Sequence, residues 1–231
     1  MNASITEIFS SIQGEGLFVG ERQIFVRFAD CNLKCDYCDT TNGKRVGEVT
    51  SLRVLEKIKK LNTGRIHSVS VTGGEPLLYA DFLQELLPQI KKMGLKTYLE
   101  TNGTLPGELS KILKMIDYVA MDIKLPSTGN PACWIKHREF LEILNDSRIR
   151  PGEFFVKIVM TSKTKASEIK KAVDIIAGVS KYIPLVLQPV SPIRNVKKVL
   201  PRNTFAFQNQ AMDRLATVKV IPQMHKILGV R

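Results

Sequence analysis

The chain has 231 residues, of which 44% are hydrophobic and 24% are charged, and its formal net charge is +12. This size and apolar content suffice for one sizeable core, so we expect residues 1–231 to form a single domain. No apolar stretch approaches the ~20 residues that span a bilayer, and the first residues lack the basic and apolar blocks of a signal peptide. We therefore expect a cytoplasmic protein with no membrane partner.

The positive charge is spread along the chain rather than gathered in one segment. Lysines such as Lys59, Lys91 and Lys170 fall on several expected helices, without a long basic run and without interleaved aromatic residues. This pattern indicates a solvated surface, and no direct nucleic-acid contact is expected. Such a field would favour an anionic small substrate or an acidic electron donor.

Strand-like and helical patterns alternate along the sequence. The apolar faces expected for two helices are Leu52, Leu55, Ile58 and Leu61, and Leu83, Leu86, Leu87 and Ile90, with Pro88 expected to distort the second helix. The Pro-containing stretches 125–132 and 188–204 are expected to be loops. The expected strands are 23–28, 68–72, 96–100, 117–123, 153–160, 183–187 and 217–221.

Alternation of this kind predicts parallel strands joined by crossover helices. We expect an α/β fold, an incomplete (β/α) TIM-like barrel of about six parallel strands with an N-terminal extension. The distinctive residues follow successive strands: Cys31 the first, Gly73 the second, residues 101–103 the third and Lys124 the fourth. They should therefore meet at the carboxyl ends of the strands, where such folds bind ligands.

Three of the four cysteines lie within eight residues, spaced C-x3-C-x2-C at Cys31, Cys35 and Cys38. Thiolates hold iron–sulfur clusters, usually four to a cubane, so a triad leaves one iron open to another ligand. Structural zinc is the alternative, because two of the cysteines form a C-x2-C pair, although a second such pair is missing. A disulfide is disfavoured because three close cysteines cannot all pair internally. Cys133, beside a tryptophan, is expected to pack as a small buried hydrophobe.

Residues 67–76 indicate a buried strand that ends in a glycine turn with an acid at its tip. Gly73 and Gly74 allow a backbone to approach a ligand closely, and Glu75 offers a carboxylate to a cationic amine. Joined to the cysteine triad, this turn resembles the radical S-adenosylmethionine enzymes, whose Gly-Gly-Glu segment holds the amino group of the cofactor. The resemblance implies a [4Fe-4S] cluster on the triad. It also implies S-adenosylmethionine on the open iron, cleaved by one electron to give a 5'-deoxyadenosyl radical.

Within that superfamily, the N-terminal segment 7–16 (EIFSSIQGEG), Gly20 and residues 25–28 (FVRF) lead directly into the cysteines. This arrangement resembles the 7-carboxy-7-deazaguanine synthases, and the likeness covers essentially the whole chain. One departure is Asp30, where the family more often has glycine before the first cysteine. The other matching segments are CDT at 38–40, TGGEP at 72–76, ETNG at 100–103, DIK at 122–124 and IPQMHK at 221–226.

The resemblance implies a radical ring contraction with loss of ammonia, a carbon–nitrogen lyase activity in 7-deazapurine biosynthesis of the queuosine type. The substrate would be 6-carboxy-5,6,7,8-tetrahydropterin and the product 7-carboxy-7-deazaguanine, with the cofactor regenerated. Magnesium would assist, ligated by the hydroxyl of Thr40, and Arg27 would pair with the substrate carboxylate. Flavodoxin or ferredoxin as electron donor and a homodimer are also implied.

By the same resemblance, the remaining site residues divide into a cofactor group and a substrate group. The cofactor group is Tyr37, Gly74, Glu75, Asp122, Ile123, Lys124 and Gln188. The substrate group is Ile12, Gln13, Gly14, Glu15, Arg27, Thr72 and His225.

Several of these residues also have ordinary structural interpretations. Thr40 is typical of a turn cap, Asp122 and Lys124 of an ion pair at a strand end, Gln188 of a strand terminus and His225 of a solvated side chain. Two other functions stay open. A glycyl-radical-activating enzyme would share the cluster and the cofactor, and a zinc-stabilised nucleic-acid-binding protein would account for the thiols and the basic charge.

Overall fold

The computed structural model describes residues 1–38, 47–150 and 152–230, and within them the strands form one sheet of order β3-β1-β2-β4-β5-β6-β7-β8-β9. From β2 to β9 all neighbours are parallel, whereas β1 pairs antiparallel with both β2 and β3. The strands are β1 Asn2–Ile12, β2 Arg22–Phe28, β3 Gly47–Thr50, β4 Ser68–Gly73, β5 Lys96–Thr101, β6 Tyr118–Asp122, β7 Phe154–Met160, β8 Leu185–Pro189 and β9 Val218–Val220.

The fold prediction is confirmed, because the sheet is open, with β3 and β9 at the two ends of its order. All seven predicted strands are present within a few residues of their expected bounds. Two strands were not predicted from the sequence, β1 and β3, which form the N-terminal edge of the sheet. In β1 half-buried polar residues such as Glu7 and Ser10 interrupt the apolar positions, and β3 is only four residues long.

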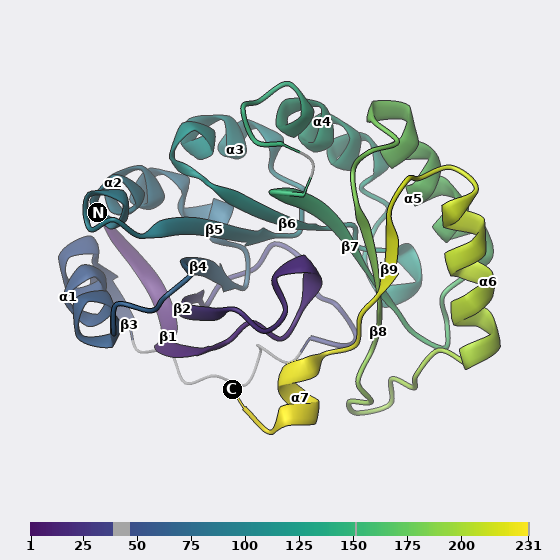
Figure 1. Cartoon of the computed structure of the whole chain (residues 1–231), viewed down its shortest axis with the longest axis horizontal. Helices are drawn as coiled ribbons and strands as arrows, with labels where there is room; N and C mark the ends of the chain where they lie inside the picture. Colours follow the sequence, from purple (N-terminus) through teal and green to yellow (C-terminus); the bar gives the residue numbers. More distant parts are fainter. Residues whose placement is uncertain (39–46, 151, 231) are drawn as a thin grey trace.

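The helices form a row along the outer side of the curved sheet, and the strands line its inner side (Figure 1). They are α1 Ser51–Leu61, α2 Ala80–Lys92, α3 Pro106–Ile112, α4 Trp134–Asn145, α5 Ala166–Val179 and α6 Pro201–Met212, with the short α7 Met224–Leu228 set apart from this row. Within the described ranges, no helix combines the length and the apolar character that crossing a bilayer demands.

The predicted helical faces are partly correct. In α2, Leu83, Leu86, Leu87 and Ile90 are all fully buried, and one helix continues through Pro88 to Lys92. In α1 the prediction for Leu52 is wrong, because this side chain is 69% exposed while Val54 is buried in its place. A helix face is set by which side meets the sheet, and an apolar residue just outside that stripe stays in solvent.

Two predicted loops need smaller corrections. The segment 125–132 is irregular apart from the short 3-10 turn η5, Pro126–Thr128. The segment 188–204 is not entirely loop, because β8 continues to Pro189 and α6 begins at Pro201. Proline at the first turn of a helix is well tolerated, since the missing N–H has no partner there.

Side chains of the parallel strands alternate between two environments. In β7, Phe154, Val156 and Ile158 enter the main core beneath the helices, while Phe155 and Lys157 face the inner side. The same alternation continues across the neighbouring strands because the side-chain period of a strand is two. The carboxyl halves of the inner faces therefore present polar groups to a shared space.

The amino-terminal part of the inner side is filled by the turn that follows β1. Phe18, in the 3-10 turn η1 (Gly16–Phe18), contacts Tyr98, Tyr118 and Phe155 with ring centroids 4.7–6.3 Å apart. Gly16 has φ +69°, and a Cβ there would lie 2.3 Å from the ring of Phe155. The turn thus plugs one end of the sheet and leaves the carboxyl ends of the strands open to ligands.

Candidate active site

A cavity lies at the carboxyl ends of the parallel strands and joins residues from every part of the chain. Its lining comes from β1 and the loop after it, from the ends of β2 and β4 to β8, and from the segment that enters α7. The predicted site residues that line it are Ile12, Gln13, Gly14, Glu15, Arg27, Cys31, Cys35, Tyr37, Cys38, Thr72, Gly74, Asp122, Lys124, Gln188 and His225.

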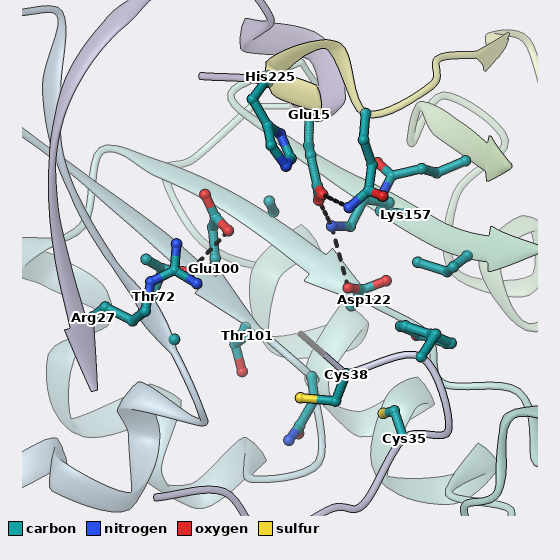
Figure 2. A pocket seen from close by; sticks show the side chains of 18 of the residues that line it. Glu15, Arg27, Cys35, Cys38, Thr72, Glu100, Thr101, Asp122, Lys157 and His225 are labelled. Atoms are coloured by element: carbon teal, nitrogen blue, oxygen red, sulfur yellow. Dashed lines mark hydrogen bonds and ion pairs between the residues drawn. The ribbon is translucent and has the colours of Figure 1, made fainter. Parts of the chain in front are cut away.

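The three clustered cysteines line this cavity from the loop after β2, and Figure 2 shows Cys35 and Cys38 at one end of it. All four cysteines of the chain are free thiols. Backbone Leu33 N–H points at Cys31 Sγ, 3.4 Å away, and Asn130 Nδ2 lies 3.1 Å from Cys35 Sγ. N–H groups aimed at sulfur suit thiolate ligands, which carry negative charge. The donor set therefore fits an iron–sulfur cluster held by three cysteines.

Among the described residues, no three side chains of His, Cys, Asp or Glu converge closely enough to hold a single metal ion. The thiolates of a cubane bind separate irons and need not converge in that way.

Cys133 precedes α4, is half-buried rather than buried, and has its Sγ 3.5 Å from the carbonyl oxygen of Pro131.

The glycine turn after β4 is packed against the start of the cysteine loop. Gly74 N donates to Phe28 O at 2.9 Å, and Glu75 N donates to Asp30 O at 2.7 Å. Gly73 has φ +111°, and a Cβ on Gly74 would lie 1.9 Å from Asp30 O. The two glycines thus permit a backbone contact that fixes the cysteine loop relative to β4. Asp30, the departure from the family pattern, accepts a hydrogen bond from the hydroxyl of Tyr79.

Glu75 is fully buried, and its side chain does not line the cavity. Its carboxylate accepts hydrogen bonds from Thr101 Oγ1 at 2.8 Å, from Leu77 N at 3.0 Å and from Asn102 N at 2.7 Å. Burial raises the pKa of Glu75 to about 7, and these hydrogen bonds oppose that rise. The side chain therefore ties the glycine turn to the end of β5, and only the backbone of this turn faces the cavity.

Charged groups form a network across one wall of the cavity. Asp122 Oδ2 lies 2.7 Å from Lys124 Nζ. It also lies 3.3 Å from Lys157 Nζ, and Lys157 pairs with Glu15 (Figure 2). Tyr37 adds its hydroxyl, 3.3 Å from Lys124 Nζ. Burial would lower the pKa of Lys157, but Asp122 and Glu15 raise it above its usual value, so this lysine stays charged.

Two buried acceptors of this wall have no hydrogen-bond donor within the described part of the chain. They are Asp122 Oδ1 and Gln188 Oε1. Both residues line the cavity, Asp122 at the end of β6 and Gln188 in β8. Since buried polar atoms are normally hydrogen-bonded, these oxygens are suited to accept from hydroxyl or amino groups of a ligand. Ile123, between Asp122 and Lys124, instead packs in the main core, so its side chain is turned away.

The opposite wall carries Arg27, Thr72 and Glu100 (Figure 2). Arg27 Nε lies 3.0 Å from Glu7 Oε1, and its guanidinium carbon lies 5.7 Å from the ring centre of Phe9. Glu100 accepts from Thr72 Oγ1 at 2.9 Å and from Gln13 Nε2 at 2.8 Å. A cation on β2 and a carboxylate on β5 are thus presented on the two strands that flank β4.

The loop after β1 and the segment entering α7 close over the cavity together. Met224 N donates to Gly14 O at 2.8 Å, and a Cβ on Gly14 would lie 2.2 Å from His225 Nδ1, so only glycine fits there. Gln223 Nε2 donates to Glu15 Oε1 at 2.7 Å. Residues 208 positions apart in the chain therefore share one site. Thr40, the predicted magnesium ligand, lies outside the described residues.

Several residues of the cavity were not predicted from the sequence, notably Glu100, Asn102, Lys157 and Gln223. The sequence contains a feature that could have identified two of these residues. Lys157 is the only charged residue in the apolar run of β7, and Glu100 begins the matching ETNG segment at a strand end. A charge inside a buried strand requires a partner, so both residues were candidates on physical grounds.

Comparison with known proteins shows which family this chain resembles. The model of the Radical SAM superfamily matches residues 26–176. Proteins named 7-carboxy-7-deazaguanine synthase match nearly the whole chain. The one from Geobacter sulfurreducens is 41% identical over 98% of this chain and 97% of its own length. The one from Methanothermobacter thermautotrophicus is 38% identical over 100% of this chain and 99% of its own length.

Solved structures share the fold. QueE from Escherichia coli aligns with a TM-score of 0.65 at 20% identity, covering 97% of this chain and 95% of that one. A radical SAM methyltransferase from Sphaerobacter thermophilus aligns with a TM-score of 0.67 at 11% identity, covering 87% of this chain and 66% of that one.

Proposed function

The chain belongs to the 7-carboxy-7-deazaguanine synthase family of radical S-adenosylmethionine enzymes, and from this membership we propose how its cavity performs the reaction. Membership makes it a lyase-type enzyme that uses a [4Fe-4S] cluster and S-adenosylmethionine. The specific reaction proposed is conversion of 6-carboxy-5,6,7,8-tetrahydropterin to 7-carboxy-7-deazaguanine with release of ammonia. One observation carries the proposal: a single cavity joins the cysteine triad at one end to Arg27 and a set of amide and carboxylate groups at the other.

Cys31, Cys35 and Cys38 are the proposed ligands of the cluster, because their thiols line the cavity and N–H donors face two of their sulfurs. When bound, the cluster would supply the electron that cleaves S-adenosylmethionine, and the 5'-deoxyadenosyl radical so released would abstract a hydrogen atom from the substrate. The chain's own groups would bind and orient the cofactor and the substrate and would exclude water from the site.

The proposed cofactor site lies between the glycine turn and β8. The backbone around Gly74 would receive the amino acid end, while the Glu75 side chain keeps that turn in place through its bonds to Thr101 and Asn102. The unpartnered acceptors Asp122 Oδ1 and Gln188 Oε1 suit the ribose hydroxyls and the adenine amino group. Tyr37, Lys124 and the backbone of Ile123 complete this group of residues.

The proposed pterin site lies on the wall formed by β2, β4 and β5. The planar guanidinium of Arg27 is shaped to pair with the substrate carboxylate. The carboxylate of Glu100, held by Gln13 and Thr72, would accept N–H groups of the pterin ring. Gln13 itself is only 3% exposed and is committed to Gln23 and Glu100, so it acts mainly by orienting Glu100.

The loop that closes the site supplies the other proposed substrate contacts. Ile12 and Gly14 line the cavity where the chain crosses from β1 toward η1, and His225 packs against Gly14 from α7. Glu15 is fixed by Lys157 and Gln223, so its charge is balanced before any substrate arrives. Segments that cover part of the cavity would help to shield a radical reaction from solvent.

Magnesium, the reductant, the assembly and the location are further proposals. Mg2+ bound through Thr40 and substrate oxygens agrees with the oxygen ligands that this cation prefers. The net charge of +12 favours an acidic electron donor such as flavodoxin or ferredoxin. A cytoplasmic location agrees with free thiols, which reducing compartments maintain. A homodimer stays a prediction of the family likeness.

The test is anaerobic incubation of cluster-reconstituted protein with S-adenosylmethionine, Mg2+, a reductant and 6-carboxytetrahydropterin, followed by mass spectrometry. A deazaguanine carboxylate product is the expected result. Cleavage of the cofactor with intact pterin would refute the substrate assignment while keeping the radical chemistry. A parallel incubation without Mg2+ tests the metal separately, since a rate unchanged by its omission would remove magnesium from the proposal.

A further inference from the structure

Cys35 is held on both sides by the loop between β6 and α4. Its chain neighbour Lys34 donates its backbone N–H to Asn130 Oδ1 at 3.0 Å, and Asp36 donates its own to Thr128 O at 2.9 Å. Between these two bonds, Asn130 Nδ2 contacts Cys35 Sγ at 3.1 Å. Three consecutive residues of the cysteine loop are therefore bound to one short segment of the chain.

The orientation of the Asn130 amide follows from its partners. A backbone N–H can only donate, so the atom that meets Lys34 N must be the carbonyl oxygen. The NH2 group is then the end that faces the sulfur of Cys35. Asn130 is only 7% exposed, so little water competes for this contact.

The residue before Asn130 is a glycine that faces the side chain of Asp36. Gly129 has φ +89°, and a Cβ there would lie 2.4 Å from Asp36 Oδ1. A residue with a Cβ would be strained at this positive φ and would displace the carboxylate of Asp36. By comparison, Cys31 Sγ has more distant donors, Leu33 N at 3.4 Å and Asn102 Nδ2 at 4.0 Å.

We propose that Asn130 is a positioning residue for the iron–sulfur cluster, which holds Cys35 in place and, through its N–H···S hydrogen bond, makes the cluster easier to reduce. This inference rests on the proposed ligation by the cysteine triad. Reduction adds one electron and makes the cluster and its thiolates more negative. A hydrogen bond to a ligating sulfur stabilises that state more than the oxidised one, and such bonds are among the factors that set cluster potentials.

The experiment is an EPR-monitored redox titration of the reconstituted cluster in three variants. Asn130→Ala removes both contacts, whereas Asn130→Asp keeps an acceptor for Lys34 N and replaces the N–H donor by oxygen. Asn62→Ala is the matched control, because Asn62 also accepts a backbone N–H, from Gly64 at 3.0 Å, in an exposed turn at the end of α1. The wild-type iron content is measured first, because failure of the wild type to load iron would refute the cluster assignment itself.

For Asn130→Ala we expect the ratio of reduced to oxidised cluster at a fixed potential to fall about threefold, about 30 mV for a one-electron couple. In Asn130→Asp this ratio should fall further, because a carboxylate oxygen would face the thiolate. In Asn62→Ala the ratio should equal that of the wild type. Wild-type midpoint potentials in both Asn130 variants would overturn the proposal.

The loading of the variants is informative as well. If Asn130→Ala takes up no iron, the midpoint potential of Asn130→Asp tests the proposal alone. A potential below that of the wild type would support the proposal, and a wild-type potential would overturn it. Native circular dichroism with no iron uptake in either variant supports the placement of Cys35 by Asn130. Loss of native circular dichroism in both would overturn the proposal, because the residue would then act on folding rather than on the cluster.

Discussion

Glu15 offers a direct test of the charge arrangement inside the cavity. Its carboxylate pairs with Lys157 and accepts a hydrogen bond from Gln223 at 2.7 Å. Burial by itself would raise the pKa of Glu15, but the charge and hydrogen bond of Lys157 outweigh it and lower the pKa from 4.5 to about 2. The perturbation is Glu15→Gln, which keeps the size of the side chain and removes the titrating group.

The sign of the effect follows from the direction of the shift. A carboxyl group whose pKa is lower in the folded chain stabilises the fold above its unfolded pKa, and this contribution is lost as the pH falls toward the folded pKa. The difference between 4.5 and about 2 corresponds to about 3 kcal/mol of stability at neutral pH. At about pH 3, where Glu15 is protonated only in the unfolded chain, about 2 kcal/mol of it is gone.

The assay is urea unfolding of the wild type and of Glu15→Gln at pH 7 and at pH 3. The wild type should lose about 2 kcal/mol more stability between the two conditions than the variant, because the other carboxylates titrate equally in both proteins. Glu139→Gln, at an exposed position of α4, is the matched control and should lose as much as the wild type. An equal loss in the wild type and Glu15→Gln would refute the depressed pKa and the pairing with Lys157.

Three further substitutions test other parts of the molecule. Cys35→Ala should prevent cluster loading and abolish turnover, and iron content at the wild-type level after reconstitution would contradict the proposed ligation. Arg27→Ala should weaken binding of the pterin, measured by calorimetry, while reductive cleavage of S-adenosylmethionine persists; an unchanged dissociation constant would remove Arg27 from its role. Leu86→Ala, at a fully buried position of α2, should lower the free energy of unfolding in urea by about 2–5 kcal/mol. A loss below about 1 kcal/mol would contradict this, because it would mean that the core relaxes to fill the void left by the missing side chain.

The strands could be predicted from sequence because their signal is local. Runs such as residues 154–160 and 68–73 are apolar enough to be buried on both faces, which is typical of parallel strands under helices. β1 and β3 lacked that signal, since they lie at an edge of the sheet where half-buried polar residues are tolerated. The exposed Leu52 shows the same limit for helices, because the sheet selects the face that is buried.

The chemical class of the site was also a property of the sequence. The spacing of Cys31, Cys35 and Cys38 places three thiols in one short loop whatever the rest of the chain does, and the TGGEP and ETNG segments fall at strand ends. Parallel strands bring such ends to one edge of a sheet, so their shared cavity followed from the order of elements.

The tertiary structure alone decided which polar groups act on one another. Glu75 accepts a hydrogen bond from the backbone of Asn102 instead of facing the cavity. Lys157 pairs with Glu15, which lies 142 positions earlier in the chain, and Asn130 contacts the sulfur of Cys35. A charged or amide side chain takes its partner from whatever burial places within about 3 Å, and that distance depends on the packing of strands and loops far apart in sequence. Sequence spacing therefore determined the reactive groups of this protein, and packing determined their partners.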